Sequence, residues 1–335
     1  MFSLIVPTIN RPNFLKLYID FLSIQNFDGE IIIGDSSSEE NFKIFEDFYK
    51  TKKLNFKVVH IEKKNKGLLE VIKELVPLIK FKYSMYICDD DYILYKNIKK
   101  CINFLEKNKN YSVAGGVNIG LILNNNDIKV IDFIDELNFQ ESLSEKPSLR
   151  LKKIANKYSV IAYSVSRSDE LKKRWLNNNK MTNRDIAVEI HPCFHMAVEG
   201  KVKKINNIFV FRLLHSMRIL GPSLLLDRYL NPNYFSTVEE SINILSELMS
   251  LNENIDYETA NKFVKIYYND YLRLSLNSKL KKKKNLFLFA FFRIKRILLR
   301  IFFIVLNRNI KYLLIYKYKE KKIFEMFYKL LKKNF

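Results

Sequence analysis

The sequence predicts an α/β fold with a doubly wound, mostly parallel sheet, followed by a helical and basic C-terminal extension. Short apolar runs alternate with segments of helical spacing through the first 90 residues, a pattern typical of parallel strands joined by helices. Polar clusters directly follow several of these runs, where folds of this class bind their ligands. Positive charge gathers in residues 271–335, which hold 19 Lys and Arg against 2 Asp and Glu.

The first strand is predicted from an apolar run that Pro7 ends, and the first helix from the spacing that follows. Ser3–Val6 (SLIV) is short and apolar, as buried strands are. In Asn13–Gln25 the apolar residues recur every three or four positions. The same reasoning predicts further strands at Glu30–Ile33, Phe56–Ile61 and Tyr83–Cys88, and helices at Asn41–Tyr49 and Gly67–Ile79.

The pattern is weaker in the later part of the chain. Further strands are predicted at Val113–Val117, Ser159–Ser166 and Ile205–Phe211, and a helix from Asp185 to Gly200. The polar stretch Asn124–Ser148 has little periodicity and reads as a loop beside the binding site. No strand pattern follows Val238, so we divide the chain into an α/β domain over residues 1–220 and a helical extension over residues 221–335.

Composition excludes several classes of protein. The chain has 335 residues, 48% of them hydrophobic, and only 8 Gly and 7 Pro, which argues against a disordered or fibrous protein. Its three cysteines suit neither paired disulfides nor a zinc site, so we expect reduced cytosolic thiols. The start, MFSLIVPTINRPNF, has no charged n-region and reads as a strand rather than a signal peptide.

Three adjacent aspartates, Asp89, Asp90 and Asp91, directly follow a predicted strand. Clustered carboxylates repel one another, so the cluster costs stability unless a cation neutralises it. Oxygen ligands on such a turn suit Mg²⁺ or Mn²⁺. The alternative is a solvated acidic loop or the first turn of a helix.

Asp35, in IIIGDSSS, also follows a predicted strand. A carboxylate there can accept a hydrogen bond from a base N–H or a ribose hydroxyl. The alternative is a helix N-terminus, because Ser37 and Ser38 precede Glu39 and Glu40. Both interpretations can hold together.

The order VPTINRP, IIIGDSSSEE, NKGLLEVIKE and YICDDDYIL over residues 1–120 resembles family 2 glycosyltransferases of the GT-A fold. In such enzymes the first strand ends in Pro-Thr at the nucleotide. The second strand ends in an Asp that reads the base, and the fourth in an Asp-x-Asp metal motif. The resemblance therefore implies that the sequence binds a nucleotide-sugar, with a UDP-sugar as the first expectation, and Mn²⁺ or Mg²⁺.

The resemblance also implies roles for individual residues. Thr8 and Asp35 would line the pocket for uracil or another base. Asp91 and Asp89 would hold the metal, with Asp91 as the principal ligand. His215 would complete the metal shell or contact the diphosphate, unless it is a half-buried histidine after a strand. The nucleotide-sugar as a whole would be bound by Thr8, Asn10, Arg11, Asp35, Asn65, Lys66, Asp89 and Asp90.

Enzymes of this family carry an acidic catalytic base about eleven positions before a Gly at a helix under the acceptor. Gly200 matches that glycine, which places Glu189 in the base position. The usual signature is Glu-Asp, whereas this chain has Val188-Glu189. Asp185 lies one helical turn earlier, so the base is either Glu189, which we prefer, or Asp185. The resemblance favours inversion at the anomeric carbon.

The tail, about residues 281–335, mixes Lys and Arg with Phe, Leu and Tyr. Its longest uncharged run around residue 290, Asn285–Phe292, is eight residues, whereas a spanning helix needs about 20. Arg293, Arg296 and Arg300 share one helical face, which predicts a helix lying on an anionic membrane surface. The alternative is an interface with a helical partner or with the body of the protein. No nucleic-acid-binding module is visible, so we expect no nucleic-acid partner.

These observations predict a metal-assisted glycosyltransferase that acts on a glycan or lipid-linked acceptor. We expect it in the cytoplasm, peripheral on the inner face of the cytoplasmic membrane, in surface polysaccharide or lipopolysaccharide assembly. One alternative is a sugar nucleotidyltransferase, although the first loop (TINR) lacks the glycines usual in that class. The other is a non-catalytic, membrane-associated scaffold.

Overall fold

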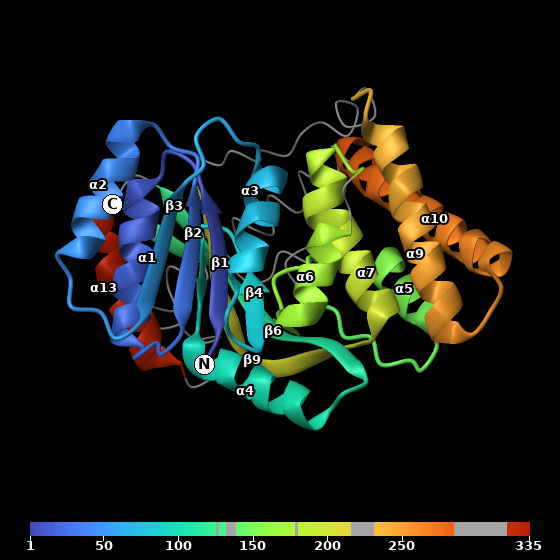
Figure 1. Ribbon diagram of the computed structural model, residues 1–335, viewed down its shortest axis with the longest axis horizontal. Helices are drawn as coiled ribbons and strands as arrows, with labels where there is room; N and C mark the ends of the chain where they lie inside the picture. The colour runs from blue at the N-terminus through green and yellow to red at the C-terminus, as the bar shows by residue number, and fades with distance from the viewer. Residues whose placement is uncertain (125–126, 132–138, 178–179, 216–230, 285–319) are drawn as a thin grey trace.

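One mixed sheet organises the molecule (Figure 1). The computed structural model describes residues 1–124, 127–131, 139–177, 180–215, 231–284 and 320–335. The described strands are β1 (Ser3–Thr8), β2 (Glu30–Asp35), β3 (Lys57–Glu62), β4 (Tyr83–Tyr86), β5 (Asp91–Ile93), β6 (Tyr111–Asn124), β7 (Asp127–Ile131), β8 (Val165–Arg167) and β9 (Lys201–Leu214). Their order is β3-β2-β1-β4-β8-β6-β9-β5, and β7 pairs with β6.

The half of the sheet around β1 is parallel. β1 pairs with β2 and β4, and β2 pairs with β3, all in parallel. The connecting helices are α1 (Pro12–Ile24), α2 (Glu39–Lys50) and α3 (Leu68–Leu75). The register sets Thr8 opposite Asp35, so the polar ends of β1 and β2 meet at one edge. The strands and helices predicted up to Cys88 are thus confirmed, each to within a few residues at its ends.

The other half of the sheet is mixed and was harder to predict. β8 is antiparallel to both β4 and β6, while β6 and β9 are parallel. β5 was not predicted; it starts at Asp91 and pairs antiparallel with β9. The strand predicted at Ser159–Ser166 is wrong over most of its length, because β8 begins only at Val165. The stretch predicted as a loop contains β7, which forms a hairpin with β6.

A helical layer covers the second part of the molecule (Figure 1). It comprises α5 (Pro147–Asn156), α6 (Ser168–Leu176), α7 (His191–Glu199), α9 (Tyr234–Glu253) and α10 (Tyr257–Lys284), whereas α4 (Tyr95–Lys107) packs on β6 and β9. α9 and α10 share a buried apolar core with α5 and α7, including Phe194, Leu245 and Tyr268. The helices after residue 220 are therefore integrated with elements before it.

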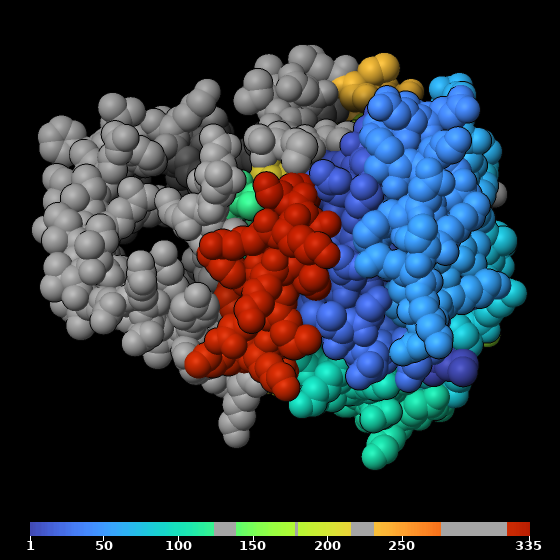
Figure 2. All heavy atoms as spheres, turned by 90° about the vertical axis from the view of Figure 1, so that its left-hand side faces the viewer, coloured from blue at the N-terminus to red at the C-terminus, as the bar shows by residue number. Residues whose placement is uncertain are grey.

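The last helix, α13 (Lys321–Asn334), packs on the α/β domain. Figure 2 shows it lying against α1, which is far from it in sequence. Phe324, Phe327 and Leu331 of α13 are buried in the main core. The apolar face of this final part of the predicted membrane tail is therefore covered by protein, while residues 285–319 lie outside the described residues. Among the described helices, none combines the length and the apolarity that crossing a bilayer requires.

Candidate active site

A cavity of about 390 Å³ opens at the carboxyl ends of the parallel strands. The aspartate cluster, the end of β1 and Glu189 all line this cavity. The lining residues are Pro7, Thr8, Ile9, Arg11, Ser36, Lys66, Gly67, Leu68, Val71, Cys88, Asp89, Asp90, Asp91, Tyr163, Arg184, Glu189 and Arg212. Five of the residues predicted to bind nucleotide-sugar, namely Thr8, Arg11, Lys66, Asp89 and Asp90, are among them.

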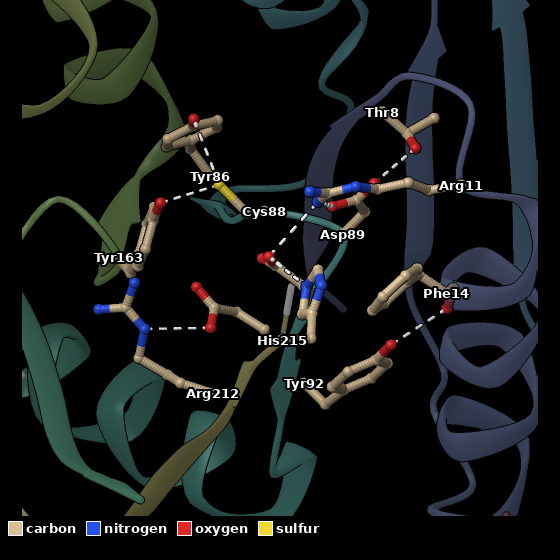
Figure 3. Close-up of polar contacts among 12 residues, drawn as sticks. Thr8, Arg11, Phe14, Tyr86, Cys88, Asp89, Tyr92, Tyr163, Arg212 and His215 are labelled. Atoms are coloured by element: carbon tan, nitrogen blue, oxygen red, sulfur yellow. Dashed lines mark hydrogen bonds and ion pairs between the residues drawn. The ribbon is translucent and has the colours of Figure 1, made fainter. Parts of the chain in front are cut away.

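Asp89 is tied to the loop after β1 (Figure 3). Thr8 Oγ1 donates to Asp89 Oδ2 at 2.6 Å, and Arg11 Nη1 donates to Asp89 Oδ1 at 2.8 Å. Burial, together with the charge of neighbouring Asp90, raises the pKa of Asp89 to about 7 despite these donors. Both Asp89 oxygens therefore already accept hydrogen bonds from protein groups.

Asp91 contacts β9, and Asp90 contacts His215, the residue that follows β9. Asp91 begins β5 directly opposite Arg212 of β9, whose Nε donates to Asp91 Oδ1 at 3.0 Å. His215 Nε2 lies 3.1 Å from Asp90 Oδ2. Burial lowers the pKa of Arg212, but the combined electrostatic effects of Asp91, Tyr163, Cys88 and Asp90 outweigh it and the pKa is raised overall. The arginine is therefore a fixed cation in the cavity wall.

The residues present fit a divalent metal ion at Asp90 and Asp91. One ligand atom each from Cys88, Asp90 and Asp91 lie within 4.8 Å of one another. Carboxylate oxygens are the donors that Mg²⁺ and Mn²⁺ prefer. Burial raises the pKa of the Cys88 thiol, which keeps it protonated and a poor ligand for such ions. Asp89, which was also predicted as a ligand, bonds Thr8 and Arg11, and His215 lies beside Asp90.

Asp35 is buried and is not among the residues that line the cavity. It is 1% exposed, and its two oxygens contact Ser37 N at 2.9 Å and His60 Nε2 at 3.0 Å. Ser38 caps α2, and Glu39 and Glu40 occupy the first turn, so the helix-start interpretation of this motif is confirmed. Asp35 thus shapes the loop that presents Ser36 to the cavity.

Asn10, Asn65 and Lys66 shape the rim. Asn10 adopts a left-handed backbone conformation (φ 53°), and its Oδ1 accepts from Ser38 N at 2.9 Å. Asn65 is likewise left-handed (φ 61°) in the turn before α3. Lys66 lines the cavity and pairs with Glu74. Asn10 and Asn65 are not among the residues that line the cavity, and both shape the loops at its rim.

Glu189 lies in a π-helical turn, Ile186–Ile190, directly before α7. The N–H of His191 bonds the carbonyl of Ile186, five residues back. Pro192 has no N–H to offer the carbonyl of Val188, which favours this wider turn. The turn directs Glu189 into the cavity wall while its neighbours on both sides are buried. Asp185 pairs with Arg184 at 3.2 Å and is not among the lining residues.

Several site residues were not predicted from the sequence. Tyr163 lines the cavity, stacks under the Arg212 guanidinium at 5.2 Å and lies 2.9 Å from Cys88 Sγ through its hydroxyl. Tyr158 donates to Glu189 Oε1 at 3.1 Å. Both tyrosines lie in or beside the segment read as a strand, and no local pattern marks them. Arg184 directly precedes Asp185 in the sequence, so a place near the candidate bases could have been predicted for it.

Comparisons with known proteins agree on the fold and family. The profile of the family described as Glycosyl transferase family 2 matches residues 3–189. The S. aureus TarS 1-349 crystal structure has a TM-score of 0.54 at 16% identity, over 85% of this chain and 75% of that one. TarS 1-349 in complex with UDP-GlcNAc gives 0.55 at 15%, over 85% and 76%. No curated protein sequence matches significantly. The structural likeness at these identities concerns the fold.

Proposed function

The chain belongs to glycosyl transferase family 2 and is a nucleotide-sugar-dependent glycosyltransferase, and from this premise we propose that it transfers sugar from a UDP-sugar to a glycan or lipid-linked acceptor with inversion. The proposal is supported by one cavity that is lined by the aspartate cluster, by Arg212 and by Glu189. The diphosphate leaving group needs its negative charge stabilised, and the acceptor hydroxyl needs a carboxylate base on the other side of the reacting carbon.

The donor's diphosphate would lie against the aspartate cluster. Arg11 and Arg212 are buried cations in this wall, and Lys66 lines the same cavity. Asp90 and Asp91 would hold Mn²⁺ or Mg²⁺, which when bound neutralises charge on the diphosphate as it leaves. The nucleoside would enter beside Thr8, with Asp35 fixing the loop that contacts its base. A structure of TarS with UDP-GlcNAc and another with UDP support UDP as the carrier.

Glu189 would act as the general base. Its carboxylate takes the proton from the acceptor hydroxyl while that oxygen attacks the anomeric carbon. The bond to the diphosphate oxygen breaks in the same displacement, so the anomeric centre inverts. The position of Glu189 in the cavity lining favours it over Asp185, which pairs with Arg184.

The acceptor and the cellular location are proposed from charge. Residues 271–335 carry most of the formal net charge of +21, and a basic segment is attracted to anionic lipid. We therefore place the enzyme in the cytoplasm, at the inner face of the membrane, with a lipid-linked glycan as acceptor in surface polysaccharide or lipopolysaccharide assembly. Family membership argues against the nucleotidyltransferase alternative, and the assembled carboxylate cluster argues against a scaffold.

The test is a panel of nucleotide-sugars with Mn²⁺, scored by release of nucleoside diphosphate. Wild type is expected to turn over one donor, and Asp91→Ala to lose this activity and Mn²⁺-dependent binding of UDP. Asp47→Ala, an exposed change on α2, is the matched control and should behave as wild type. Turnover retained by Asp91→Ala would remove the metal assignment. Silence of the wild type, with no binding of UDP, GDP or CMP, would contradict the proposal as a whole.

A further inference from the structure

The Glu189 carboxylate is held by a side chain from a distant loop. Tyr158 follows α5, 31 residues before Glu189, and its hydroxyl donates to Glu189 Oε1 at 3.1 Å. The carboxylate of a general base must point at the acceptor hydroxyl, and a displacement of about 1 Å can lower the rate about a hundredfold. A fixed donor on Oε1 restricts the rotation of the carboxylate.

The Tyr158 ring is itself held between two helices. It packs on Tyr271 of α10 with ring centroids 5.0 Å apart, and on Phe194 of α7 at 6.4 Å. Phe194 and Tyr271 also contact each other at 5.5 Å. This aromatic cluster fixes Tyr158 against α7, the helix that follows Glu189. Tyr271 of α10 therefore contacts the tyrosine that bonds the Glu189 carboxylate.

The protonation states of the groups near Glu189 make Tyr158 the donor in its hydrogen bond with the carboxylate. Burial raises the pKa of Tyr158, Tyr86 and Cys193, and the negative charge of Glu189 adds to the effect in each case. All three therefore stay protonated near neutral pH. Arg184 lines the same cavity as Glu189, as do Arg11, Lys66 and Arg212. The Tyr158 hydroxyl also lies 3.7 Å from Cys193 Sγ, and the shorter contact, with the Glu189 carboxylate, is the stronger one.

We propose that Tyr158 is a positioning residue that orients the Glu189 carboxylate and stabilises its charged form, with Tyr271 of α10 holding the tyrosine ring in place. The catalytic part of this inference rests on the proposed function. The contact between the two side chains does not, and it is tested separately. The helices after residue 220 thus contribute to the geometry of the base as well as to the core.

The experiment compares Tyr158→Phe with wild type in two measurements. Tyr158→Phe retains the ring and removes only the hydroxyl. Infrared titration follows the carboxyl band that is lost in Glu189→Gln, and this readout does not require turnover. Removing a donor to the charged form should raise the pKa of Glu189 by about one unit. Tyr257→Phe is the matched control, because it removes a tyrosine hydroxyl bonded to Asn243, away from the cavity.

The second measurement uses the donor identified in the nucleotide-sugar panel. Tyr158→Phe should lower kcat at least about tenfold, shift the acidic limb of the pH–kcat profile to higher pH, and leave the KM for the donor unchanged. An unshifted Glu189 titration in Tyr158→Phe would overturn the inference, whatever the turnover. A wild type without turnover but with the expected shift would instead contradict the proposed function alone.

Discussion

Three consecutive aspartates have three different sets of partners. Asp89 turns back to Thr8 and Arg11 on the first loop, whereas Asp91 turns to Arg212 on β9. Asp90 lies between them, near His215 and Arg11. Asp89 and Asp90 lie in a turn, which the hydrogen bond from Asp91 N–H to the Cys88 carbonyl closes at 3.2 Å, and β5 begins only at Asp91, so the three side chains leave the backbone in different directions. The cluster is thus compensated by cations on both sides, and this arrangement lets the carboxylates remain together without solvent.

Arg11→Met tests that compensation. Arg11 is 9% exposed and bonds Asp89 and Asp90, so its removal leaves buried negative charge unbalanced. We expect the free energy of unfolding to fall by about 3 kcal/mol, measured by urea denaturation without added metal. Lys50→Met, which breaks the surface pair with Glu46, should cost less than about 1 kcal/mol. A loss for Arg11→Met as small as the control's would show that the cluster does not need this cation.

The sequence predicted the site where its residues directly follow strands. Thr8, Arg11 and the aspartates occupy strand ends, and parallel strands bring these ends together. Tyr158 and Tyr163 could not be found in this way, because their partners are Glu189 and Cys88, at least 31 residues away in the chain. Asp35 was found, yet its pairing with His60 of β3 depends on register between two strands. Long-range contacts of this kind leave no local pattern.

At the scale of elements, α13 connects the end of the described chain to the site. Phe327 packs on Phe21 at 4.7 Å and on Tyr92 of β5 at 5.0 Å. Phe335 packs on Phe14, which in turn packs on His215 at 4.6 Å. The helix therefore supports both α1 and the strand that begins with Asp91.

Phe327→Ala is expected to lower the free energy of unfolding by about 3 kcal/mol, the cost of a large cavity in a packed aromatic core. Thermal and urea unfolding measure this. Phe235→Ala is the matched control, because Phe235 of α9 is 65% exposed, and it should change stability by less than about 0.5 kcal/mol. If the two variants unfold alike, α13 does not contribute to the core as described.

The strand predicted at Ser159–Ser166 was wrong because this apolar segment is buried without forming a strand over most of its length. Ser159–Ser166 is apolar because Ile161 and Ala162 are buried and Tyr163 lines the cavity, yet these residues form turns before β8. An apolar run indicates burial but does not distinguish a strand from a buried turn. The sequence of α13 is ambiguous in a similar way. Its mixture of Lys with Phe and Leu suits a helix on a membrane surface and a helix packed on a protein core equally well. Only tertiary packing decides between them.

At the scale of the whole molecule, charge and catalysis are separated along the sequence. Residues 271–335 hold 19 of the 57 Lys and Arg but only 2 of the 36 Asp and Glu. The cavity, by contrast, is built from residues 7–212. Helices α10 and α13, on either side of residues 285–319, both pack on the folded body.

Membrane association can be tested without removing α13. The triple change of Arg293, Arg296 and Arg300 to Gln should weaken binding to vesicles containing phosphatidylserine by about 3 kcal/mol, because each basic residue near the surface contributes about 1 kcal/mol. Co-sedimentation at low and high salt measures it. The same change at exposed Lys57, Lys64 and Lys107 is the control. Equal loss in both triple variants would show that the tail has no special role.

We propose that one cavity binds the donor at the aspartate cluster and removes the acceptor proton at Glu189. The most direct test measures UDP binding and sugar transfer in parallel for Glu189→Gln and Asp185→Asn. We expect Glu189→Gln to bind UDP with Mn²⁺ as wild type does but to lose at least about a hundredfold in kcat. We expect Asp185→Asn to retain most of its activity. Normal transfer by Glu189→Gln, with transfer lost in Asp185→Asn, would contradict this proposal.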